Sequence, residues 1–216
     1  MIVCAATNNA GKLRELRRIL TRCGHTVRSL RELGVTLDPE ETGATFAENA
    51  ALKAAAFCRA TGLPTVADDS GLCVDALDGA PGVFSARYAG EHGNDDANNR
   101  KLLAALADVP EGARGAKFVS AVCLMLPGGR SLTVTGECPG AVGTALRGEN
   151  GFGYDPLFIP DRVGLPGGAT RPNTERRSYA ELADAEKDAI SHRGRALEQL
   201  EAALPDFLPE ESSIIK

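Results

Sequence analysis

The stretch Val66-Ala67-Asp68-Asp69-Ser70-Gly71-Leu72 decides the fold, because it joins an apolar strand to a group of polar side chains. The apolar residues predict a short buried strand that delivers two carboxylates, a hydroxyl and a glycine to its exit. Adjacent strand residues point to opposite faces, so Asp68 and Asp69 share one site only if the backbone turns, as Ser70-Gly71 permits. Two close anions favour a bound cation, and oxygen ligands without nearby imidazole favour Mg²⁺ over zinc. A plain surface turn is the alternative.

The composition of the chain limits the classes of protein to consider. Its 216 residues suffice for one substantial core, and we expect a single domain over residues 1–216. The net charge of −5 argues against general nucleic-acid binding. Without an apolar run near the ~20 residues of a membrane span, or a signal peptide at Met1–Cys4, we expect a cytoplasmic protein with no membrane partner. Six cysteines without a Cys-x-x-Cys pair predict free thiols.

A second polar segment follows the first predicted strand, over residues 2–6. Thr7-Asn8-Asn9-Ala10-Gly11-Lys12 leads from this strand into a helix, and a helix start with an adjacent lysine favours anions such as phosphate. The segment is not a Walker A loop, because the first glycine of that motif is missing and Leu13 follows Lys12. Ordinary helix capping is the alternative explanation.

An acidic loop and a capped helix connect these two segments. Residues 38–43 form the loop, and the capping box Thr45-Phe46-Ala47-Glu48 opens a helix that runs to about Gly62. Asn49 and Lys53 lie four residues apart on one face, within reach of a common partner, although an exposed polar face is the simpler explanation. Because this helix connects the acidic loop to the Asp68-Asp69 strand, both acidic groups could converge on one metal ion, although a solvated charge cluster is the better explanation of the loop in isolation.

The second half of the chain alternates helix and strand signals. Residues 94–107 predict a helix, and residues 116–126 and 131–138 predict a hairpin around Pro127-Gly128-Gly129. A third strand is expected over 141–146, a long loop over 161–177 and a closing helix over about 186–204.

The last polar segments carry an aromatic ring and a group of cations. Glycines flank Phe152 in Gly151-Phe152-Gly153-Tyr154-Asp155-Pro156, which leaves its ring open for stacking on a planar base, and Asp155 offers an acceptor for a ring N–H. A glycine-rich turn is the alternative. Lys187, His192 and Arg193 cluster near the start of the closing helix, where cations oppose the helix dipole and need an anionic partner or solvent.

Six segments in this order resemble the non-canonical purine nucleoside triphosphate pyrophosphatases, over residues 2–204. They are Thr7-Asn8-Asn9-Ala10-Gly11-Lys12, Glu41-Thr42-Gly43 with Thr45-Phe46-Ala47-Glu48-Asn49-Ala50, Ala67-Asp68-Asp69-Ser70-Gly71-Leu72, Gly79-Ala80-Pro81-Gly82 with Ser85-Ala86-Arg87-Tyr88, Gly151-Phe152-Gly153-Tyr154-Asp155-Pro156, and Ile190-Ser191-His192-Arg193. The joint over 165–177 is longer than is usual in that family, and Arg177 stands where the family has a lysine.

The resemblance implies an α/β fold: a long twisted mixed β-sheet flanked by helices, in two lobes with an active-site cleft between them. It also implies a homodimer that hydrolyses inosine, deoxyinosine and xanthosine triphosphates (ITP, dITP and XTP) to the nucleoside monophosphate and pyrophosphate with Mg²⁺. Asp69 would be the general base and a metal ligand, with Glu41 as second ligand. The expected substrate contacts are Thr7, Asn8, Asn9, Ala10, Gly11 and Lys12 on the triphosphate, Ser70, Phe152, Gly153, Tyr154 and Asp155, and Lys187, His192 and Arg193 on base and phosphates.

Two other functions stay open at this level. A related pyrophosphatase for modified pyrimidine nucleotides is one, although Phe152 and the cations at 187–193 favour a purine. A non-catalytic nucleotide-binding module is the other, and the acidic residues Glu41, Asp68 and Asp69 argue against it.

Overall fold

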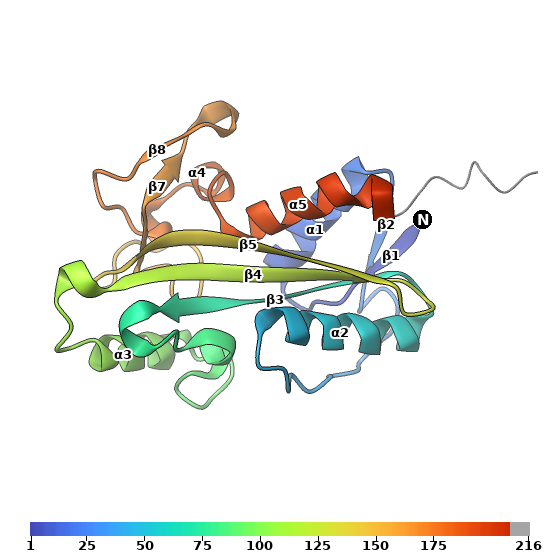
Figure 1. Ribbon diagram of the computed structural model, residues 1–216, viewed down its shortest axis with the longest axis horizontal. Helices are drawn as coiled ribbons and strands as arrows, with labels where there is room; N and C mark the ends of the chain where they lie inside the picture. The colour runs from blue at the N-terminus through green and yellow to red at the C-terminus, as the bar shows by residue number, and fades with distance from the viewer. Residues whose placement is uncertain (208–216) are drawn as a thin grey trace, which may run out of the picture. The chain divides into compact units, whose positions relative to one another are not determined.

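The fold is mixed α/β, with one six-stranded mixed sheet flanked by helices, as predicted (Figure 1). The computed structural model describes residues 1–207, apart from the side chains of Glu15 and Ile19. The sheet has the order β2-β1-β3-β4-β5-β6; β1 is parallel to β2 and β3, whereas β5 and β6 are antiparallel.

The strands of this sheet are β1 (Ile2–Ala5), β2 (Thr26–Ser29), β3 (Thr65–Val74), β4 (Gly115–Met125), β5 (Ser131–Val142) and β6 (Phe158–Pro160), and a separate hairpin consists of β7 (Arg162–Gly164) and β8 (Thr170–Pro172). The α-helices are α1 (Ala10–Arg22), α2 (Phe46–Thr61), α3 (Asp95–Ala105), α4 (Asp184–Asp188) and α5 (His192–Phe207). Short 3₁₀ turns cover Asp75–Leu77, Gly82–Arg87, Glu111–Ala113, Pro166–Gly168 and Tyr179–Glu181. Within residues 1–207, none of these helices is long and apolar enough to cross a bilayer.

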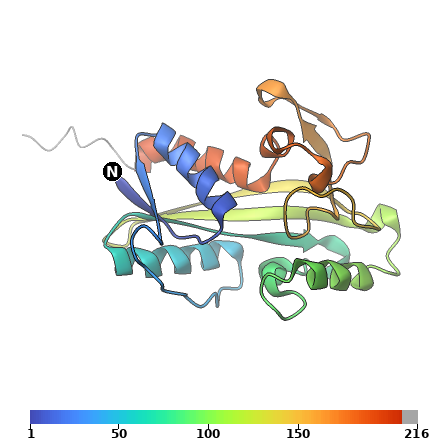
Figure 2. The same cartoon turned by 180° about the vertical axis from the view of Figure 1, so that it is seen from behind.

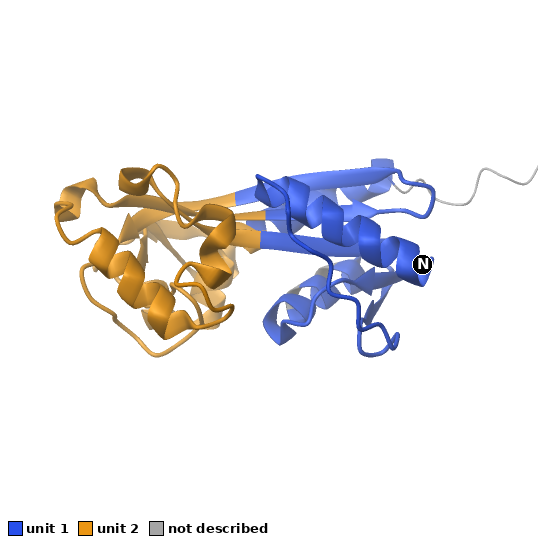
Figure 3. Cartoon of the chain, turned by 90° about the horizontal axis from the view of Figure 1, so that it is seen from below, with its two compact units in different colours: residues 1–69, 121–136, 195–216 blue, residues 70–120, 137–194 orange. Residues whose placement is uncertain are grey.

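The chain divides into two compact units, neither of which is continuous in sequence (Figure 3). Of the described residues, unit 1 contains 1–69, 121–136 and 195–207, and unit 2 contains 70–120 and 137–194. The strands β3, β4 and β5 contribute residues to both units.

Unit 1 has a core on each face of its part of the sheet. Alternate strand residues point to opposite faces, so Val66 packs with residues of α1 and α5, whereas the next residue, Ala67, packs with residues of α2. Both opposite views of the chain show the same layering, with α1 and α5 over one face and α2 under the other (Figures 1 and 2). This alternation determines which helix each functional side chain of β3 meets.

Unit 2 is built around a cluster of aromatic rings. The Phe118 ring of β4 packs edge-on against Phe158 of β6, at 4.7 Å between centroids, and lies parallel to the Tyr179 ring at 5.7 Å. Leu72 and Val74, at the end of β3, belong to the same core and are fully buried. The imidazole ring of His192 also stacks on Phe118 of this cluster.

Local sequence signals give the correct boundaries for two elements. The capping box at the start of α2 is present: the Thr45 hydroxyl accepts from the Glu48 amide, and the Glu48 carboxylate accepts from the Thr45 amide. The predicted hairpin between β4 and β5 is also present, and its turn is closed by the Gly129 amide donating to the Leu126 carbonyl. Both signals act within a few residues, so they do not depend on the rest of the fold.

Three expectations for the second half of the chain are wrong. Residues 141–146 form no separate strand, because β5 runs on to Val142 beside β6; only a glycine at 140 allows this, since a Cβ there would lie 2.3 Å from the Ile159 carbonyl. The closing helix is two helices, because the Ser191 hydroxyl accepts from the Gly194 amide and caps a new start. The expected long loop contains the β7–β8 hairpin.

Candidate active site

The two adjacent carboxylates of the Asp-Asp pair lie on opposite faces of the sheet. Strand β3 runs without a turn from Thr65 to Val74, so the turn that would let both carboxylates share one site is absent. Asp68 forms an ion pair of 3.0 Å with Lys12 of α1, while Asp69 lies 3.5 Å from Lys53 of α2. The strand can stay regular because each helix supplies a cation to the carboxylate on its own face, although Asp68 is only 2% and Asp69 only 8% exposed.

Asp69 and Glu41 converge on the same ammonium group. Lys53 Nζ donates to Glu41 Oε1 at 2.9 Å and to Asp69 Oδ1 at 3.5 Å, and Asn49 Nδ2 donates to Asp69 Oδ2 at 3.1 Å. Asn49 and Lys53 therefore share Asp69 as a partner, whereas the sequence alone favoured an exposed polar face. The Asn49 side chain also accepts from the Gly43 amide through Oδ1, at 2.8 Å, so one buried amide joins the acidic loop to β3.

Burial controls the charge of this cluster. It raises the pKa of Asp69, the nearby Glu41 carboxylate raises it further, and Lys53 and the Asn49 hydrogen bond only partly compensate. Burial would lower the pKa of Lys53, but Asp69 and Glu41 outweigh burial and the pKa of this amine is raised. The cluster thus combines a carboxylate that binds a proton more readily than usual with a persistent cation.

Glu41 and Asp69 are the residues that could hold a divalent cation. Their oxygens are the hard ligands that Mg²⁺ prefers, and both already meet one positive charge. Among the described residues, no group of three His, Cys, Asp or Glu side chains is arranged to hold a metal ion. A site with one or two carboxylates suits Mg²⁺, which usually takes its remaining ligands from water and substrate phosphates.

The predicted phosphate segment forms the start of α1. Asn9 caps the helix, because its Oδ1 accepts from the Lys12 amide at 3.0 Å, and the Thr7 hydroxyl accepts from the Asn9 amide at 3.1 Å. Asn8 and Ala10 are exposed, and Gly11 is half-buried. The segment therefore offers a helix start and the Lys12 ammonium within unit 1, as anion binding requires.

The predicted base-binding segment lies in unit 2, where it contacts one lysine from another part of the chain. Phe152 is 52% exposed. The carboxylate of Asp155 accepts from the Phe152 amide at 3.0 Å and forms an ion pair of 2.6 Å with Lys187. The Lys187 ammonium lies 5.4 Å from the centre of the Phe152 ring. The exposed Phe152 ring and the Lys187 ammonium over it are thus brought together.

His192 and Arg193 occupy the first turn of α5 and are both buried. The imidazole ring of His192 is stacked on Phe118 at 4.9 Å between centroids, and Arg193 donates to the Ser70 hydroxyl at 3.1 Å. Ser70 and Arg193 were both predicted as substrate contacts, and the structure joins them in unit 2. Tyr154 differs from its neighbours, because its side chain is only 4% exposed and its hydroxyl donates to the Ser85 carbonyl.

A sequence model of the Ham1 family matches residues 3–203. The chain belongs to the Ham1 family. This membership confirms the resemblance inferred from the six segments, since relatives in the family carry the name of that activity.

Two of these relatives resemble the chain over nearly its whole length. The dITP/XTP pyrophosphatase of Nocardia farcinica is 54% identical over 207 residues, which cover 94% of each chain. That of Exiguobacterium sibiricum is 49% identical over 210 residues, which cover 97% of this chain and 100% of the relative. A crystal structure from Mycobacterium abscessus, described as a nucleoside-triphosphatase and dITP/XTP pyrophosphatase, is 46% identical with a TM-score of 0.74, covering 93% of this chain and 97% of that one.

Sequence reasoning missed two residues of helix α3 in this member of the Ham1 family. Asp95 accepts from the Gly153 amide at 2.7 Å, and Asn99 donates to the Gly153 carbonyl at 2.8 Å. These contacts join residues more than 50 positions apart through a backbone group, so no local pattern announces them. The only signal is the (i, i+4) spacing of two polar residues on one helix face.

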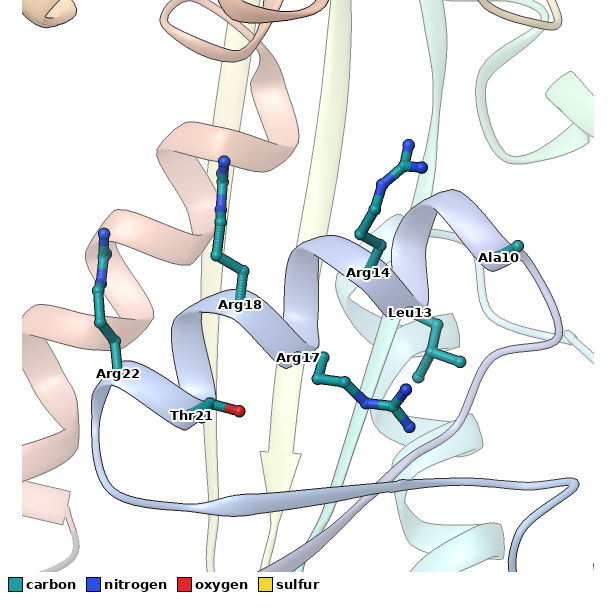
Figure 4. Close-up of a pocket in the computed structure, with 7 residues that line it drawn as sticks. All are labelled: Ala10, Leu13, Arg14, Arg17, Arg18, Thr21 and Arg22. Atoms are coloured by element: carbon teal, nitrogen blue, oxygen red, sulfur yellow. The ribbon is translucent and has the colours of Figure 1, made fainter.

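A hollow of about 690 Å³ on this Ham1 chain lies elsewhere, along α1 (Figure 4). It is lined by Ala10, Leu13, Arg14, Arg17, Arg18, Thr21 and Arg22. Arg17 and Arg22 form ion pairs with Glu32 and Glu201. Of its lining residues only Ala10 belongs to the predicted phosphate segment, so we assign the hollow no part in the candidate active site.

Proposed function

We propose that this protein hydrolyses dITP, ITP and XTP to the nucleoside monophosphate and pyrophosphate, and so removes non-canonical purines from the nucleotide pool. The relatives named dITP/XTP pyrophosphatase, which match nearly the whole chain, support this activity. The observation that carries the proposal is the cluster around Lys53, where the buried Asp69 carboxylate and Glu41 meet on the α2 face of the sheet. Carboxylates with perturbed pKa values cluster at catalytic sites, and burial raises the pKa of Asp69.

Asp69 acts as the general base in this reaction. A water molecule attacks the α-phosphorus, its proton passes to Asp69, and the bond from the α-phosphorus to the bridging oxygen breaks as pyrophosphate leaves. A carboxylate with a raised pKa is a better proton acceptor than an exposed one. Asn49 orients this carboxylate, and Lys53 keeps Glu41 beside it.

Mg²⁺ is the cofactor of this proposal, with Glu41 and Asp69 as its ligands. When bound, it would neutralise charge on the phosphates. Thr7, Asn8, Asn9, Ala10, Gly11 and Lys12 bind the triphosphate through the helix start and the Lys12 ammonium. The test is thermal unfolding with and without Mg²⁺: the ion should raise the melting temperature of the wild type but not of Glu41→Gln, and equal shifts would contradict the assignment.

Base selectivity follows from the donors around Phe152. The keto group at position 6 of hypoxanthine or xanthine accepts hydrogen bonds, whereas the amino group of adenine donates them. Lys187, His192 and Arg193 carry hydrogen-bond donors, from which a keto oxygen can accept but the amino group of adenine cannot, so ATP lacks this interaction while its base stacks on Phe152. GTP shares the keto group, and we attribute its rejection to a pocket that cannot satisfy the 2-amino group; equal turnover of GTP and ITP would contradict this.

We further propose a cytoplasmic homodimer. Six free cysteines fit a reducing compartment, and the dimer is what the family resemblance implies. Light scattering coupled to gel filtration tests the dimer, since a mass near 22.6 kDa would indicate a monomer.

Product analysis tests the activity itself. The purified protein is incubated with Mg²⁺ and XTP, ITP, GTP or ATP, and pyrophosphate is measured separately from orthophosphate. Pyrophosphate released mainly from XTP and ITP is the expected result; release of orthophosphate, or equal use of ATP, would refute the proposal.

Asp69→Asn, with the exposed Asp96→Asn as matched control, separates an enzyme from a binding module. The first variant should lose turnover while it still binds XTP. Modified pyrimidine triphosphates, added as a further substrate class, test the remaining alternative.

A further inference from the structure

The loop that presents Phe152 has a glycine on each side of the ring, and both glycines have positive φ angles. Gly151 and Gly153 have φ angles of +83° and +61°, and the ring between them is half exposed. Glycine in this region is conformationally free, so a loop built in this way needs external restraints to hold an aromatic ring in one orientation.

Helix α3 supplies two of these restraints, on the two polar groups of one residue. The Gly153 amide donates to Asp95 Oδ2 at 2.7 Å, and the Gly153 carbonyl accepts from Asn99 Nδ2 at 2.8 Å. Asp95 and Asn99 are one helical turn apart, so a rigid element fixes both hydrogen-bonding groups of the residue that follows Phe152. Asp155 holds the Phe152 amide from the other side.

Neither side chain is explained by the needs of its own helix. The N-cap of α3 is Asn94, whose Oδ1 accepts from the Ala97 amide at 3.0 Å, so Asp95 is not required as the cap. Asn99 is only 4% exposed, and its Oδ1 has no hydrogen-bond partner within residues 1–207. Burying this unpaired Oδ1 costs free energy that an apolar side chain would avoid. The hydrogen bond from Nδ2 to the Gly153 carbonyl is therefore the contact that accounts for an asparagine here.

We propose that Asp95 and Asn99 are positioning residues of the purine-binding loop, which fix the orientation of the Phe152 ring and thereby set the preference for purine bases. This inference rests on the proposed function, because it assigns a role within base recognition. The two residues touch the loop backbone and act on the base only through Phe152. Their effect is therefore on substrate binding and on the purine preference, and not on the chemical step at Asp69.

Asp95→Ala and Asn99→Ala test the proposal, with Asp96→Ala as the matched control. Asp95 and Asp96 both lie in the first turn of α3, so both changes remove the same favourable charge from the helix start, but only Asp95 contacts Gly153. The readouts are kcat and KM for XTP and UTP, the melting temperature, and the calorimetric affinity for xanthosine monophosphate, which requires no turnover.

Each test variant should raise KM for XTP by about tenfold at nearly unchanged kcat. It should weaken the affinity for xanthosine monophosphate by a similar factor. KM for UTP should change by less than about twofold, because a pyrimidine gains little from the ring, and Asp96→Ala should behave as the wild type. A merely structural role would instead lower kcat for both substrates alike and leave the monophosphate affinity of the folded fraction unchanged, which would overturn the inference.

Failure of the inference and failure of the proposed function are distinguishable. A wild-type protein that does not hydrolyse XTP refutes the function. A wild type that hydrolyses XTP, with Asp95→Ala and Asn99→Ala variants that keep its KM and monophosphate affinity, refutes only the role of α3.

Discussion

Asn49 is a small buried side chain whose loss should disturb the candidate active site. Its side-chain amide is fully buried and joins two partners: it accepts from the Gly43 amide at 2.8 Å and donates to the Asp69 carboxylate at 3.1 Å. A net contribution of about 1 kcal/mol for the neutral bond, and about 1.5–3 kcal/mol for the bond to a charged group, predicts that Asn49→Ala lowers the free energy of unfolding by about 2.5–4 kcal/mol.

Urea unfolding measures this loss, and turnover of XTP measures its effect on the site. Leu52→Ala is the control on the same helix, because Leu52 is 42% exposed and its truncation should cost less than about 1 kcal/mol. Asn49→Asp separates the two links, since it keeps the acceptor for the Gly43 amide but sets a second carboxylate oxygen against Asp69. If Asn49→Ala costs no more than Leu52→Ala and turnover persists, the bridging role of this amide is refuted.

Three further predictions concern unit 2. Phe152→Ala should raise KM for XTP by about 10–100-fold through lost stacking, at unchanged stability; an unchanged KM would exclude the ring from base binding. Tyr154→Phe should cost about 1 kcal/mol of stability, because its buried hydroxyl donates to the Ser85 carbonyl at 2.9 Å, and a changed KM would show that this hydroxyl reaches substrate. The hydrogen bonds from Arg177 lower the pKa of Glu186 to about 2, below that of an unfolded carboxyl. Glu186 therefore stabilises the fold above about pH 5 and loses this contribution as the pH falls toward 2, so the stability difference between wild type and Glu186→Gln should shrink from pH 6 to pH 3; a constant difference would contradict the ion pair.

Local signals determined the elements that the sequence predicts well. The Thr45 to Glu48 capping box and the turn at Pro127-Gly128-Gly129 act over three or four residues, and both are found where expected. The placement of Asn49 and Lys53 on one helix face was also predictable, because helix geometry alone brings residues four apart onto the same side. What local geometry cannot give is the identity of their shared partner, Asp69.

Long-range contacts account for the errors. Asp68-Asp69-Ser70-Gly71 has the composition of a turn, yet β3 continues through it because cations from α1 and α2 neutralise the two carboxylates on opposite faces. The contribution of α3 to the purine-binding loop was equally hidden, since Asp95 reaches a backbone amide 58 residues away. In both places a charge is satisfied by a distant partner, and hydrophobic periodicity carries no information about such a partner.

The discontinuity of unit 1 has a consequence for how the chain folds during synthesis. The core beneath α1 includes Ala196, Leu197, Leu200 and Leu204 of α5, which are among the last described residues to leave the ribosome. Strands β1, β2 and the start of β3 are made first but cannot complete this core until α5 arrives, whereas all of unit 2 has been translated by residue 194. Every residue of unit 2 is therefore made before α5 is complete, and until α5 is made the apolar face of α1 lacks this part of its cover.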